Sequence, residues 1–212
     1  MAKLTFAMSD VTGDTRVLAR SAMGYDWNYL ADDETLLFGS TDETAFSVKN
    51  ITPGTGISTG TGTLFKGAVL RMGDVIETTI VVDVTGLNSG NADGDVIGVA
   101  ATANCHLGQI TAAKNGTIFA GTMQCVETPA GGEPDVDLNS NTVATLTEDA
   151  AHNASGTSVA LLAAAADWTG VLAPKSLTAL PAADTYLYFI ASGGATDATY
   201  TAGKFVIKLY GY

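Results

Sequence analysis

Residues 74–84 read DVIETTIVVDV, and this stretch decides the fold class. Side chains of an extended chain point alternately to two sides, so residues two apart share a face. One face is apolar apart from a threonine, whereas Glu77 and Asp83 lie on the other. The apolar face consists of Ile76, Thr78, Ile80, Val82 and Val84. The pattern predicts a strand buried on one side.

Similar patterns continue toward the C-terminus. Residues 117–127 place Phe119, Met123 and Cys125 on one face, which predicts a strand with Cys125 in the core. Residues 87–95 are rich in turn formers and precede a short apolar run at 96–100. Residues 186–191 and 204–209 are also typical of strands, and we expect them to pair as a hairpin across a turn-rich loop at 193–203.

Several strands separated by turn clusters, without alternating strands and helices, favour a mainly β fold: a β-sandwich or jelly-roll. We place this domain at residues 64–212. Residues 157–168 contain four consecutive alanines, 163–166, which predict one short helix capped by Ser155 or Thr157. No repeat of fixed period indicates a solenoid or propeller.

Residues 1–63 are expected to form a separate, irregular N-terminal region, either an arm or peripheral strands. An aromatic cluster at Tyr25, Trp27 and Tyr29 fits a core or an exposed anchor for a partner. Residues 52–63 read TPGTGISTGTGT, which lacks periodicity and is rich in helix and strand breakers. The pattern predicts a flexible connection that acts as a hinge.

Charge and hydropathy exclude two classes of partner. The 212 residues carry a formal net charge of -12, whereas nucleic-acid binding requires clustered lysine and arginine. The acidity suits either a soluble surface or docking to a basic one. The longest apolar run, residues 159–166, is far shorter than the ~20 residues that span a membrane. Residues 1–10 lack a signal-peptide pattern, so we expect folding in the cytoplasm.

Cysteine and histidine offer little chemistry. Cys105 and Cys125 are the only cysteines, and in a reducing compartment we expect both to be free, buried and inert. Adjacent side chains of a strand point to opposite faces, so Cys105 and His106 would not share a metal or act as nucleophile and base. His152 lies in a polar stretch and is interpreted as an exposed loop residue.

Acidic residues supply two weak candidates for a site. Asp135 and Asp137 would share a strand face, where paired carboxylates serve calcium binding or glycoside hydrolysis, although a solvated acidic edge is the simpler interpretation. Residues 91–95, NADGD, resemble the start of a calcium loop but lack its terminal glutamate. No H-E-x-x-H, C-x-x-C, Walker or G-x-G-x-x-G motif is present. We therefore predict no catalytic, cofactor-binding or metal-binding residue and no enzymatic activity.

Three stretches carry a resemblance to a known class of proteins: residues 73–78 with 86–88, residues 108–118, and residues 196–205. They resemble virion structural proteins of marine tailed bacteriophages, and the resemblance covers residues 73–212. It implies a capsid cement or decoration protein on the outside of the head, an oligomer, often a trimer, that binds and stabilises the shell by clamping neighbouring copies of the major capsid protein. It carries no binding residue over to this chain.

Two other classes remain open. A carbohydrate-binding or host-adhesion module of a virion would use exposed aromatic side chains as sugar platforms, with Trp27, Trp168, Tyr210 and Tyr212 as candidates. A glycosidase would require two facing carboxylates in a cleft.

Overall fold

The computed structural model describes residues 5–11, 14–20, 26–30, 35–37, 46–164, 166–170, 173–193 and 197–212, with side chains from residue 49 onward. Within these residues the chain forms two antiparallel sheets and two helices of one turn each, α1 (Thr55–Ser58) and α2 (Ala112–Asn115). The mainly β class predicted from the sequence is confirmed.

The larger sheet contains ten strands in the described residues. Their spatial order is β1 (Thr5–Val11), β2 (Asp14–Arg20), β3 (Asp26–Leu30), β4 (Thr35–Leu37), β5 (Phe46–Asn50), β6 (Leu64–Met72), β7 (Val75–Asp83), β14 (Ala202–Gly211), β9 (Ile118–Ala130) and β12 (Lys175–Ser176). The smaller sheet has the order β11 (Ser158–Leu162), β10 (Val136–Asn141), β13 (Thr185–Ala191) and β8 (Gly108–Ile110).

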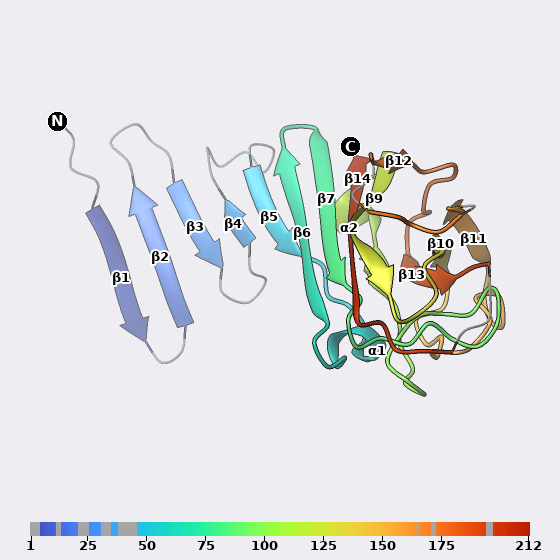
Figure 1. Ribbon diagram of the computed structural model, residues 1–212. Coiled ribbons are helices and arrows are strands. Elements are labelled where there is room, and N and C mark those ends of the chain that lie inside the picture. The colour runs from blue at the N-terminus through green and yellow to red at the C-terminus, as the bar shows by residue number, and fades with distance from the viewer. Residues whose placement is uncertain are drawn as a thin grey trace.

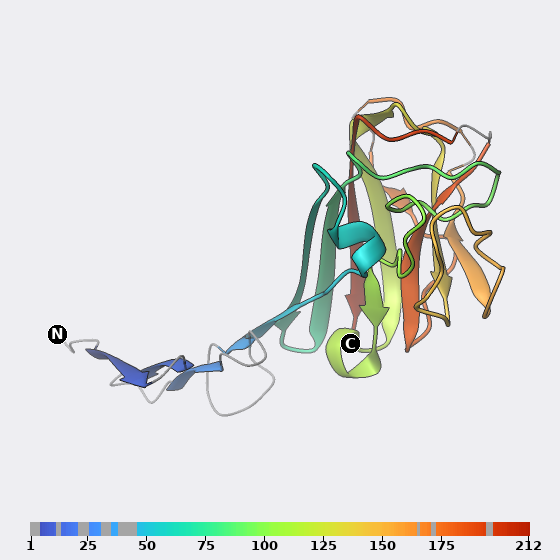
Figure 2. The same cartoon turned by 90° about the horizontal axis from the view of Figure 1, so that it is seen from below.

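The two sheets pack face to face as a β-sandwich, as the sequence predicted (Figure 1). The core lies between the inner faces of β7, β14 and β9 on one side and of β10, β11 and β13 on the other. Strands β1–β4 continue the larger sheet away from this body as a single layer (Figure 2). The molecule therefore has a two-layer body and a one-layer extension.

Alternation decides which side chains enter the core. Ile76, Ile80 and Val82 of β7 are buried, whereas Glu77 and Asp83 are half-buried on the outer face, as predicted from residues 74–84. Strand β14 alternates in the same way, with the odd-numbered residues from Gly203 to Gly211 buried. β14 lies between β7 and β9, where both of its edges are hydrogen-bonded.

The predicted helix at residues 157–168 is wrong, because residues 158–162 form strand β11 at the edge of the smaller sheet. Their backbone pairs with β10, and the side chains of Leu161 and Leu162 enter the core. Helix propensity is a weak preference that burial and strand pairing override. The predicted hairpin of residues 186–191 with 204–209 is also wrong, since β13 belongs to the smaller sheet and β14 to the larger.

Residues 52–63, predicted to be a flexible hinge, are instead packed against the body. Ile57 is fully buried, and the backbone N–H groups of Gly54 and Gly56 donate to the carbonyl oxygens of His106 and Asn104 at 2.8 and 3.1 Å. A Cβ atom at Gly56 would collide with the Cys105 sulfur, so glycine is required for this approach. The glycines here permit close packing and not flexibility.

Candidate functional site

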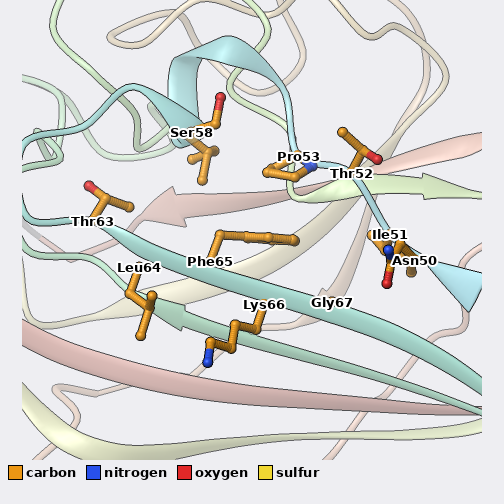
Figure 3. Close-up of a pocket in the computed structure, with 11 residues that line it drawn as sticks. Asn50, Ile51, Thr52, Pro53, Ser58, Thr63, Leu64, Phe65, Lys66 and Gly67 are labelled. Carbon is orange, nitrogen blue, oxygen red and sulfur yellow. The ribbon is translucent and has the colours of Figure 1, made fainter. Parts of the chain in front are cut away.

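Two grooves flank the segment that leads from β5 into α1. The first, the β6 groove, has a volume of about 780 Å³ and lies between residues 50–58 and residues 63–67 of the chain. Figure 3 shows Phe65 lying along this groove, opposite Pro53, while Leu64 and Lys66 point to the other side of β6. Phe65 is half-buried and packs against the core, so it forms the apolar floor.

The second groove, the His106 groove, has a volume of about 490 Å³. One wall is residues 51–55, and the other is formed by Asn104, His106, Gln109, Thr111, Lys114 and Tyr186. The second wall combines β8, α2 and the loop before them with β13, because Gln109 lies opposite Tyr186 in the smaller sheet. Segments 50 to 130 residues apart in sequence therefore meet here, and no local pattern could have indicated this groove.

His106 lies against two tyrosines in this groove. Its ring centroid is 4.9 Å from that of Tyr186 and 6.3 Å from that of Tyr188. Burial lowers the pKa of His106, because the charged imidazolium loses solvation. Nδ1 of His106 is sealed from solvent and has no hydrogen-bond partner among the described residues.

The two cysteines are free and buried, as predicted. Burial raises the pKa of the Cys105 thiol to about 12 and also raises that of Cys125. Cys105 Sγ donates to the carbonyl oxygen of Thr102 at 3.0 Å, and Cys125 Sγ donates to that of Glu127 at the same distance. Neither thiol is a nucleophile at neutral pH.

The prediction that Asp135 belongs to a solvated acidic edge is wrong, because only 7% of this residue is exposed. Burial, followed by the negative charges of Asp137, Asp167 and Glu133, raises the pKa of Asp135 to about 6, against the attraction of Lys175. One oxygen, Oδ1, is sealed without a hydrogen bond in the described structure. Asp137 is half-buried, and its Oδ1 accepts from Ala164 N at 2.6 Å.

The calcium-like stretch at residues 91–95 is closed by hydrogen bonds within the protein. Asn91 donates from its backbone N and its Nδ2 to the two carboxylate oxygens of Asp149, at 2.8 and 2.7 Å. Ala92 N donates to Asp95 Oδ2 at 2.7 Å, and Asp95 is buried. In the part of the chain that the structure describes, no three histidine, cysteine or acidic residues are placed to hold a metal ion.

His152 is half-buried, which corrects its interpretation as an exposed loop residue. Its Nδ1 lies 2.9 Å from Ser158 Oγ, so the ring joins its loop to the start of β11.

Trp168, one of the proposed sugar platforms, is fully buried. Its Nε1 donates to the carbonyl oxygen of Val136 at 2.9 Å, its ring meets Phe205 edge-on, and Lys175 Nζ lies 4.2 Å from its centroid. Trp168 therefore stabilises the core and is not available to a ligand. The side chains of Trp27 and of the aromatic cluster at residues 25–29 lie outside the described residues.

Exposed apolar side chains gather at one end of the larger sheet, which we call the apolar end: Met72, Val75, Phe119 and Tyr212, exposed by 50, 43, 51 and 66%. Met72 lies opposite Val75, and Gly211 lies beside both Ile76 and Ile118, so strand pairing places the four at the same end of the sheet. The rings of Phe119 and Tyr212 are 6.1 Å apart. The sequence pattern places Phe119 on the same strand face as Cys125 and gives no indication of this surface.

Two lysines on the outer face of the same sheet are paired with carboxylates. Lys208 Nζ lies 2.7 Å from Glu77 Oε1, and Lys204 Nζ lies 3.2 Å from Asp83 Oδ2 and 3.1 Å from Glu127 Oε2. The hydrogen bond that the Lys208 ammonium donates to Glu77 lowers the pKa of this carboxyl.

Comparison of the chain with protein-family models, curated proteins and solved structures found no match. None of the described helices is long and apolar enough to cross a bilayer.

Proposed function

We propose that this chain is a cement or decoration protein of a tailed-bacteriophage capsid. It binds the assembled head shell from outside, contacts the major capsid protein as a homotrimer, and acts by binding and not by catalysis. Assembly takes place in the host cytoplasm, and the final location is the capsid surface. Support comes first from the resemblance of residues 73–78, 108–118 and 196–205 to virion structural proteins.

The observation that carries the proposal is the apolar end. Soluble monomers rarely expose a contiguous group of large apolar side chains, and such groups mark contacts with other proteins. Aromatic and methionine side chains are enriched in protein interfaces, and the apolar end contains Phe119, Tyr212 and Met72. It is built on β6, β7 and β9 of the sandwich and on the end of the chain beyond β14, so it presents a preformed surface.

Charge supports a basic partner. The net charge is -12, and Lys204 and Lys208 are already paired with Asp83, Glu127 and Glu77 on the outer face of the larger sheet. The chain as a whole therefore carries an excess of negative charge, which favours docking to a shell surface rich in lysine and arginine.

Stabilisation then follows from mass action. A protein that binds the assembled shell and not its free subunits shifts the equilibrium toward assembly by the free energy of binding. Repetition over the shell makes weak individual contacts sufficient. The one-layer extension, β1–β4, offers a second contact with a neighbouring subunit.

The test uses heads of a phage that carries this protein, stripped of it and then incubated with purified chain. Occupancy is measured by quantitative gel analysis and electron microscopy, and shell strength by the temperature at which DNA is released. We expect Met72→Ser with Phe119→Ser to lower occupancy at least tenfold. Leu64→Ser is the matched control, because Leu64 is 45% exposed at the opposite end of β6.

A second variant begins at residue 46, which removes β1–β4 but keeps β5 and the buried Ile51. We expect it to fold and to bind with reduced occupancy. If the purified full-length chain, added at saturating concentration, does not bind to the stripped heads, the proposal is refuted. Equal losses in Leu64→Ser and in the apolar-end variant would refute the assigned contact surface.

A further inference from the structure

The His106 groove combines a size suited to a small ligand with polar groups that the protein leaves unused. Its volume of about 490 Å³ falls within the range of small-molecule sites. We propose that this groove binds one saccharide unit of a glycan.

The imidazole of His106 provides a directed hydrogen-bond donor. Burial holds its pKa below the ordinary value of 6.5, so the ring is neutral at pH 7 and carries one N–H. Sealed N–H groups without an acceptor are rarer in proteins than sealed acceptors. Because Nδ1 is sealed and unpartnered, we assign the proton to Nε2. Nε2–H is then available to a hydroxyl oxygen in the groove.

Tyr186 provides an aromatic surface beside this donor. The Tyr186 ring is half-buried and tilted by 55° to the His106 ring at a centroid distance of 4.9 Å. Its hydroxyl has no hydrogen-bond partner within the described structure, and the strand β13 that carries it is paired on both sides. A rigid ring with a free polar tip suits the C–H face and hydroxyls of a sugar.

Groups at the rim extend the same chemistry. The Thr52 hydroxyl and the Lys114 ammonium have no partner among the described residues, and Gln109 Nε2 reaches the Asp184 carbonyl oxygen only at 3.5 Å. These groups can donate hydrogen bonds to the hydroxyl oxygens of a sugar. Lys114 would pair with the carboxylate of an acidic sugar. The net charge of -12 disfavours a polyanion, so a neutral or sparsely charged glycan is the expected ligand.

A site with few contacts gives weak binding, and copies repeated on a particle would add avidity. That last step alone rests on the proposed capsid location. The groove itself lies within one chain, so its binding is testable on the isolated protein and independently of any particle.

The experiment uses saturation-transfer NMR on the full chain with four probes: the methyl glycosides of galactose, mannose and N-acetylglucosamine, and methyl glucuronide. We expect at least one probe to bind, with a loss of at least tenfold in Tyr186→Ala and in His106→Ala. Tyr212→Ala is the matched control, since Tyr212 is an exposed tyrosine outside the groove, and it should bind normally. Lys114→Met should weaken only the glucuronide.

Amide chemical shifts of the unaltered protein provide a second measurement that does not depend on a variant folding. Shifts on titration should centre on residues 51–55, 104–109 and 186. Lack of binding by all four probes, shifts centred elsewhere, or equal losses in Tyr186→Ala and Tyr212→Ala would overturn the proposal.

Discussion

Asp135 makes the stability of this protein depend on pH in an unusual direction. The pKa of this carboxyl rises from an ordinary 3.8 to about 6 in the folded chain, first because of burial and then because of neighbouring carboxylates. Protonation is therefore easier in the folded state than in the unfolded state. The favourable contribution is fully present below about pH 4 and is lost as pH rises through about 6.

The size of this stability change follows from the difference between the two pKa values. Each pKa unit corresponds to about 1.4 kcal/mol, so ionised Asp135 costs at most about 3 kcal/mol at pH 7.5. Residual solvent screening reduces this cost, and we expect about 1 to 3 kcal/mol. Asp135→Asn is neutral at every pH. Its unfolding free energy relative to that of the unaltered protein should rise by this amount between pH 4 and pH 7.5.

Urea denaturation at half-unit pH steps, followed by the fluorescence of the buried Trp168, measures this difference. Asp74→Asn is the matched control, because Asp74 is exposed and its replacement removes the same charge without a burial effect. Its difference from the unaltered protein should be flat with pH. A flat difference for Asp135→Asn, or one that falls toward pH 7.5, would refute the reasoning.

Three further variants test the core. Gly56→Ala should destabilise the fold by about 1 to 3 kcal/mol in urea, because its Cβ would collide with Cys105; an unchanged stability would restore the hinge interpretation. Trp168→Phe should cost about 1 to 3 kcal/mol, since it leaves the buried Val136 carbonyl without its donor, and calorimetry measures this. Replacing Cys105 and Cys125 by Ala should lower the free energy of unfolding by about 1 to 3 kcal/mol. In the unaltered protein a thiol reagent should label both cysteines only after denaturation. Rapid labelling of the folded chain would contradict their burial.

Strand alternation could be predicted from the sequence wherever one face of a strand meets the second sheet. Ile80 and Val82 of β7 and Ile207 and Leu209 of β14 are fully buried, because these strands lie at the centre of the sandwich. Which strands pair with one another could not be predicted in the same way. The chain between β13 and β14 is short enough for a hairpin, yet the two strands enter different sheets, and no local residue pattern records that choice.

Residues that depend on distant segments were missed for the same reason. The sequence around Asp135 is typical of an acidic surface turn. In the folded chain, however, the charges of Glu133 and of the distant Asp167 and Lys175 act on its carboxyl. His106 and Tyr186 are 80 residues apart in sequence and meet only because β8 pairs with β13. Composition predicts which residues are apolar or charged, whereas the grooves depend on how separate segments assemble.

Phe119 shows why one failure of the alternation rule is informative. Cys125 is fully buried, as predicted, and so is Met123, but Phe119 on the same strand is 51% exposed. Tyr210 lies opposite Ala120 and Gly211 opposite Ile118, so Phe119 is an extra residue without a partner on β14. Such a bulge re-aims a side chain and is a designed feature more often than a defect. Here it turns an aromatic ring out of the core and onto Tyr212. The exposed Phe119 ring lacks the burial that it would have in the core. A contact with a partner protein at the apolar end would bury it.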